Sequence, residues 1–110
     1  MEITFATGEE ADWNDSKHLF RKHSPQRAKL IRRRLDDLRA APTLQVMRGL
    51  PGRCHELSGH YKDHLSVDLD GPYRLIFKPA HDPLPRKADG GLDWHQVTAI
   101  VILGVDNTHE

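Results

Sequence analysis

The spacing of apolar residues changes at Leu50-Pro51-Gly52, and this change constrains the fold more than any other feature. Before this turn, over residues 25–40, apolar side chains recur every three or four residues, as on one face of a helix. After it, over residues 64–78, apolar and polar residues alternate, as in half-buried strands. A chain of 110 residues is the length of one domain. We therefore expect a single domain, residues 1–110, in which the helices come before most of the strands of a sheet.

Two helices are expected before the turn. Residues 9–23 carry aromatic and leucine side chains at near-helical spacing, with acidic residues in the first turn. The second helix, over about residues 25–40, begins with Ser24 as a cap and Pro25 at its first position. Its apolar stripe consists of Ala28, Ile31, Leu35 and Leu38. Thr43 is expected to cap one further turn.

Five strands are expected around these helices, over residues 2–7, 54–57, 64–69, 73–78 and 97–105. Asp70-Gly71 predicts a hairpin turn between the third and the fourth. The last strand is almost entirely apolar, which is typical of a strand buried on both faces. Residues 79–93 are rich in proline, glycine and charge, so we expect a long exposed loop. The order predicts an α+β fold with an antiparallel-rich sheet.

Charge and composition exclude several classes of protein. The 16 basic and 16 acidic residues cancel, which argues against a general binder of nucleic acid, although residues 17–39 are strongly basic and create a local field. A single cysteine excludes an internal disulfide. No apolar run approaches the ~18 residues of a membrane span, and the first ten residues lack the apolar segment of a signal peptide. We expect a cytoplasmic protein.

Residues 50–79 read LPGRCHELSGHYKDHLSVDLDGPYRLIFKP and contain three motifs in order: Leu50-Pro51-Gly52, Leu57-Ser58-Gly59 and Tyr73-Arg74-Leu75-Ile76-Phe77. As an ordered set they resemble the HigB branch of the RelE/ParE toxin superfamily, the killer proteins of plasmid-maintenance toxin–antitoxin pairs. The resemblance covers nearly the whole chain. It implies two N-terminal helices packed on a small curved sheet, in the order β-α-α-β-β-β-β.

The same resemblance implies a function and its partners. Similar toxins are mRNA endonucleases that act in the ribosomal A site, need no cofactor and are neutralised by an antitoxin. The expected partners are therefore a HigA-like helix-turn-helix antitoxin, the ribosome and mRNA, with no membrane. The ParE branch instead poisons DNA gyrase, which makes gyrase inhibition the second hypothesis.

Metal-free RNA cleavage needs a base, an acid and a cation that offsets charge on the phosphorane. The resemblance implies that Arg74 is this cation, since a guanidinium stays charged and can bind two phosphate oxygens. The alternative is that Arg74 pairs with a carboxylate such as Asp68 across the hairpin. His55 aligns with an active-site histidine, a residue type whose ordinary pKa of ~6.5 suits proton transfer. Its alternative is a half-exposed strand residue without a chemical role.

The chain also departs from the pattern of similar proteins. Ser58 stands where they carry a lysine, and Thr108 stands near the position of a C-terminal active-site tyrosine. His60, Lys62 and His109 are the nearest residues able to replace them. These departures also support the second hypothesis, either as a gyrase poison or as a homologue that only binds an antitoxin.

Three further features leave alternatives open. The run Arg32-Arg33-Arg34 is either a solvated helix face or a contact with ribosomal RNA phosphates, which would be salt-dependent and blind to sequence. The loop over residues 79–93 is either a tolerated insertion or a contact surface for the antitoxin or ribosome. Cys54, His60 and His64 do not match the spacing of zinc sites, so no metal is expected.

Overall fold

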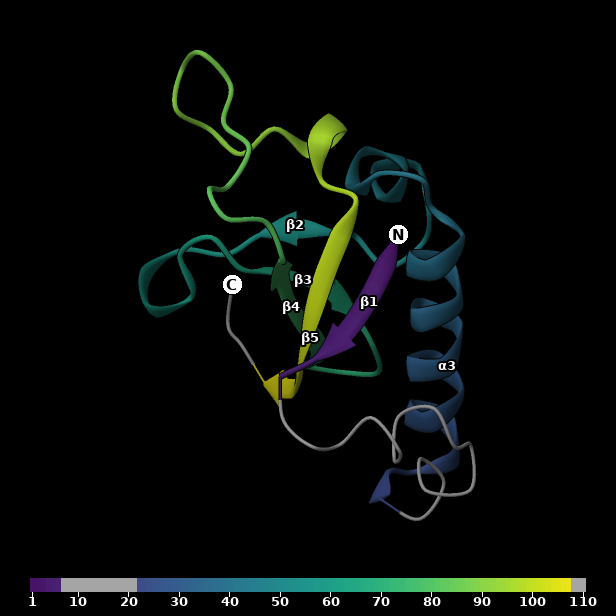
Figure 1. The fold of residues 1–110 in the computed structure, drawn as a ribbon. Coiled ribbons are helices and arrows are strands. Elements are labelled where there is room, and N and C mark those ends of the chain that lie inside the picture. Colours follow the sequence, from purple (N-terminus) through teal and green to yellow (C-terminus); the bar gives the residue numbers. More distant parts are fainter. Residues whose placement is uncertain (7–21, 108–110) are drawn as a thin grey trace.

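A computed structural model describes residues 1–6 and 22–107 of the chain. Helix α3 (Pro25–Ala40) lies beside a five-stranded sheet (Figure 1). The helix begins as predicted, because the Ser24 hydroxyl accepts a hydrogen bond of 3.2 Å from the backbone N–H of Arg27 and Pro25 occupies the first position. The helix ends just before Pro42, which disfavours further helix.

The sheet has the order β1-β5-β4-β3-β2. Its strands are β1 (Glu2–Phe5), β2 (His55–Glu56), β3 (Leu65–Asp68), β4 (Tyr73–Pro79) and β5 (Ala99–Asn107). β1 runs parallel to β5, and the other three pairs are antiparallel. The hairpin predicted at Asp70-Gly71 is present, with the N–H of Tyr73 donating to the carbonyl of Asp70 at 3.0 Å. The α+β class is confirmed, with a mixed sheet.

The prediction of two N-terminal helices is not borne out. α3 is the one long helix in the described ranges 1–6 and 22–107, and most of the helix expected over residues 9–23 lies outside them. The further turn expected after Thr43 is present as a 3-10 helix, η1 (Leu44–Gly49), but Thr43 makes no side-chain capping hydrogen bond. η1 instead contributes buried Leu44 and Met47 to the core.

The core lies between α3 and one face of the sheet. It includes the predicted helix stripe and alternate residues of three strands: Ala28, Ile31, Leu35, Leu38, Leu65, Val67, Leu75, Phe77, Ile100 and Ile102. We call this the helix-side face. β5 is not buried on both faces as predicted, because Ile100 and Ile102 enter the core while Val101 and Leu103 are only half-buried among the described residues.

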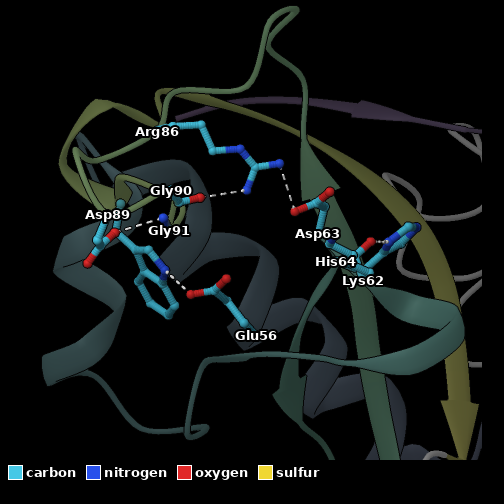
Figure 2. Close-up of polar contacts among 9 residues, drawn as sticks. Glu56, Lys62, Asp63, His64, Arg86, Asp89, Gly90 and Gly91 are labelled. Atoms are coloured by element: carbon cyan, nitrogen blue, oxygen red, sulfur yellow. Dashed lines mark hydrogen bonds and ion pairs between the residues drawn. The ribbon is translucent and has the colours of Figure 1, made fainter.

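Residues 79–93 are more ordered than the expected exposed loop. Arg86 and Leu92 form an isolated β-bridge, and Leu92 is buried. A short 3-10 helix, η3 (Trp94–Gln96), follows, and the indole N–H of buried Trp94 donates to Glu56 of β2 at 3.0 Å. Arg86 also reaches Asp63 at 3.1 Å (Figure 2). The composition of residues 79–93 did not predict this order, because the segment contains few apolar residues and those few are the ones that anchor it.

Among the described residues, no helix has the length and apolar character that crossing a bilayer would require.

Candidate functional site

The side of the sheet turned away from α3 brings together His55 and Arg74, two of the residues singled out from the sequence. Successive side chains of a strand point to opposite faces, so the positions between core residues share this side. We call it the far face, and its members are His55, Ser66, Asp68, Arg74, Ile76 and Asp106. In one row across the strands, His55 lies opposite Ser66 and Ser66 opposite Ile76. The next row places Arg74 between Asp68 and Asp106.

Arg74 has a carboxylate on each neighbouring strand. Its Nε lies 3.4 Å from Oδ1 of Asp68, so the ion pair considered from the sequence is present. Its side chain is 15% exposed. A guanidinium has five N–H donors in a planar fork, so an ion pair through Nε engages only one of them. Asp68 therefore orients the Arg74 guanidinium through its Nε.

His55 lies on β2 at the edge of the sheet and is half-buried. Its Nδ1 is 2.9 Å from the carbonyl oxygen of Arg53. A carbonyl only accepts hydrogen bonds, so this contact places the proton on Nδ1 and leaves the lone pair of the neutral ring on Nε2. From the ordinary strand spacing, the Cα atoms of His55 and Arg74 are roughly 12 Å apart, two strands across and two residues along. The side chains of His55 and Arg74 are long enough to span this distance and contact one phosphate group from opposite sides.

The residues predicted as helpers lie in the connection between β2 and β3. His60 belongs to a short 3-10 helix, η2 (Gly59–Tyr61), and both His60 and the following Lys62 are exposed. The carbonyl of Lys62 accepts a hydrogen bond of 2.9 Å from Nδ1 of His64 (Figure 2). His109 lies outside the described residues.

A small pocket between η2 and the strands β4 and β5 was not predicted. It has a volume of about 120 Å³ and is lined by Tyr61, Ile76, Leu103, Gly104, Val105 and Asp106. A register shift between Ile76 and Phe77 shapes it, and Gly104 has φ of +143°. The Tyr61 hydroxyl donates to the Asp106 carboxylate, and this hydrogen bond, followed by burial, raises the pKa of Tyr61. A glycine inside an apolar strand is a known sign of a bulge, so Gly104 was the available signal.

The three consecutive arginines of α3 do not share one environment. Arg33 is exposed and Arg32 half-buried, but Arg34 is only 8% exposed. Its Nε donates to the backbone carbonyl of Asp68 at 2.9 Å. The solvated helix face considered for this run is therefore wrong for Arg34, whose hydrogen bond connects α3 to the end of β3. Periodicity could not show this, since a charged residue is not expected in an apolar stripe.

The histidine and cysteine candidates for a metal do not form a cluster. In the described part of the chain, no group of three or more His, Cys, Asp or Glu side chains is placed to hold a metal ion. Cys54 packs against the core, and burial raises the pKa of its thiol to about 12. That thiol stays protonated at neutral pH.

No protein-family model matches the chain, and no curated protein does either. Among solved structures, a YoeB/ParE toxin from Agrobacterium tumefaciens matches with a TM-score of 0.60, covering 99% of this chain and 100% of that one. The chain therefore shares the fold of this YoeB/ParE toxin. Because only 8% of residues are identical, the likeness concerns the fold. The RelE/ParE-like fold implied by the three motifs is thus supported, and the HigB branch is not singled out within it.

Proposed function

We propose that this chain is the toxin of a type II toxin–antitoxin pair and that it cleaves mRNA on the ribosome. The observation that carries the proposal is the position of His55 and Arg74. They come from two separate motifs and two different strands, yet they share the far face of a RelE/ParE-like sheet. The matching structure bears the description of a YoeB/ParE toxin, which supports a toxin and hence an antitoxin partner. A HigA-like helix-turn-helix protein is the antitoxin that the motifs favour, and the cytoplasm is the proposed location.

In the proposed reaction the 2′-hydroxyl attacks the adjacent phosphorus and the 5′-oxygen leaves. His55 would accept the proton of the 2′-hydroxyl at Nε2, because Nδ1 is held by the Arg53 carbonyl. Arg74 would offset the charge that develops on the phosphorane oxygens. His60, Lys62 and His109 are the candidates for protonating the leaving oxygen. The products would be a 2′,3′-cyclic phosphate and a 5′-hydroxyl.

One observation favours a second function. Arg74 lies between two carboxylates, Asp68 and Asp106, in its row of the sheet. Two negative groups beside one guanidinium lower its attraction for phosphate. A toxin that acts by binding, as a gyrase poison or as an antitoxin-binding homologue without cleavage, would tolerate this arrangement better than a nuclease.

The test is a translation reaction with purified ribosomes and a defined mRNA, in which new 5′ ends are mapped. Wild type should cut only in the presence of ribosomes, and Arg74→Ala should lower the cleavage rate by about 100-fold or more, as losing one charge-stabilising donor does in other enzymes. Arg48→Ala, an exposed arginine of η1, is the control and should cut normally. Intact mRNA with wild type, or normal cutting by Arg74→Ala, would reject the proposed nuclease activity. DNA damage in cells that express the protein, with their mRNA intact, would identify a gyrase poison.

A further inference from the structure

The segment Gly52-Arg53, just before β2, has an unusual backbone. Both residues have positive φ, +112° at Gly52 and +49° at Arg53. Glycine adopts such angles easily, but they are uncommon for a residue that carries a side chain as large as arginine. Such conformations persist where the surroundings impose them, and they concentrate at functional sites.

Three contacts impose this conformation. The carbonyl of Gly52 accepts a hydrogen bond of 2.7 Å from the backbone N–H of Asp68. A Cβ atom at Gly52 would lie 2.8 Å from Nε of Arg34, so the backbone packs directly on that buried side chain. The carbonyl of Arg53 accepts the hydrogen bond from Nδ1 of His55. Arg53 is thereby tied to the residue that we propose as the base.

The side chain of Arg53 meets the same carboxylate as Arg74. Its Nε lies 3.2 Å from Oδ2 of Asp68, while Nε of Arg74 lies 3.4 Å from Oδ1. One carboxylate thus holds two guanidinium groups, one on each oxygen. The Arg53 side chain is 63% exposed, against 15% for that of Arg74. An exposed ion pair of this kind contributes little to stability and exchanges readily.

We propose that Arg53 is a second phosphate-binding residue of the site and that it contacts the RNA phosphodiester chain together with Arg74. Two guanidinium groups converging on one anion are a typical arrangement for binding phosphate. Asp68 holds both groups in place until the RNA arrives, and the exposed Arg53 then turns from the carboxylate to a phosphate. This inference rests on the proposed function, because it assigns the ligand of the same face.

The experiment measures binding without cleavage. The full chain is titrated onto a fluorescent single-stranded RNA oligomer that carries 2′-O-methyl groups throughout, and anisotropy gives the Kd over a series of KCl concentrations. Arg53→Asn removes the guanidinium with a side chain that tolerates positive φ. We expect this variant to weaken binding about tenfold and to lower the salt slope by ~0.7, the value for one phosphate contact on a single strand.

Two controls separate a phosphate contact from a structural role. Asp68→Asn breaks the same ion pair but keeps both cations, so binding should stay equal or become tighter. Arg48→Asn removes one exposed positive charge from η1 and should change the Kd by no more than about twofold. If Asp68→Asn weakens binding as much as Arg53→Asn, or if Arg53→Asn matches Arg48→Asn, the inference is overturned.

The ribosome assay, run on the same variants, distinguishes this inference from the proposed function. Binding that depends on Arg53 without any cleavage by wild type would support the inference and reject the nuclease. Cleavage by wild type with unchanged RNA affinity in Arg53→Asn would support the nuclease and overturn the inference. A wild-type chain that does not bind the oligomer also overturns it. Circular dichroism checks the fold, and Arg53→Lys, which keeps the charge, should bind between wild type and Arg53→Asn.

Discussion

The two faces of the sheet differ although the same strands build both. On β4, Leu75 and Phe77 are fully buried on the helix-side face, whereas Arg74 and Lys78 belong to the other side and keep contact with solvent. The helix-side face therefore supplies most of the free energy of folding, since that energy follows buried apolar area. The far face holds charged groups that a stable core does not need. Substitutions on the two faces should accordingly change different properties.

The two faces are not independent, and Arg34 connects them. Its side chain projects from α3 and is buried, and its Nε donates a hydrogen bond to the backbone carbonyl of Asp68. The carboxylate of Asp68 in turn contacts Arg53 and Arg74 on the far face. Through Arg34, the core therefore helps to position Arg53 and Arg74, the proposed phosphate-binding residues.

The largest effect on stability is expected from Phe77→Ala on the helix-side face. Removing a fully buried ring should lower the free energy of unfolding by about 3–5 kcal/mol. Lys78→Ala, at the neighbouring exposed position, should change it by less than ~0.5 kcal/mol. Urea denaturation followed by tryptophan fluorescence measures both. Similar losses for the two variants would contradict the separation of the faces.

A smaller effect is expected from Arg34→Met, which tests the connection between the faces. The substitution keeps much of the buried volume but leaves the carbonyl of Asp68 without its donor, which should cost about 1–3 kcal/mol. RNA binding should weaken as well, because the Gly52-Arg53 backbone packs on Arg34 and would lose this support. Arg33→Met, on the exposed side of the same helix, is the matched control. Unchanged stability and RNA binding in Arg34→Met would show that the far face does not depend on this contact.

The smallest effect concerns the hairpin turn, where α3 meets the strands that carry both faces. Arg27 donates two hydrogen bonds to Asp70, and these hold the pKa of Asp70 below its ordinary value. A carboxyl whose pKa is lower in the folded state stabilises the fold above its unfolded-state pKa, and this contribution disappears as the pH falls through the folded-state pKa. Asp70→Asn should therefore have a lower urea midpoint than wild type at pH 7. The difference should vanish well below pH 4, and a difference independent of pH would contradict this assignment.

Local patterns predicted the elements better than the site. The start of α3 followed from Ser24 and Pro25, and the β3–β4 turn followed from Asp70-Gly71, because each depends on residues that are neighbours in the chain. The face on which Arg74 lies followed from strand alternation. Its ion pair with Asp68 was one of two open alternatives until the register was known.

The sequence by itself determined the α+β class, the helix stripe and the position of the hairpin, since these are set by periodicity and by the local preferences of proline, glycine and capping residues. Only the tertiary structure decided that Arg34 is buried, that Trp94 anchors the 79–93 segment and that Arg53 joins Arg74 at one carboxylate. The pairing of β1 with β5, which are far apart in the sequence, was likewise decided only by the tertiary structure. Contacts between residues far apart in sequence depend on the register and packing of the whole fold, and no local pattern contains that information.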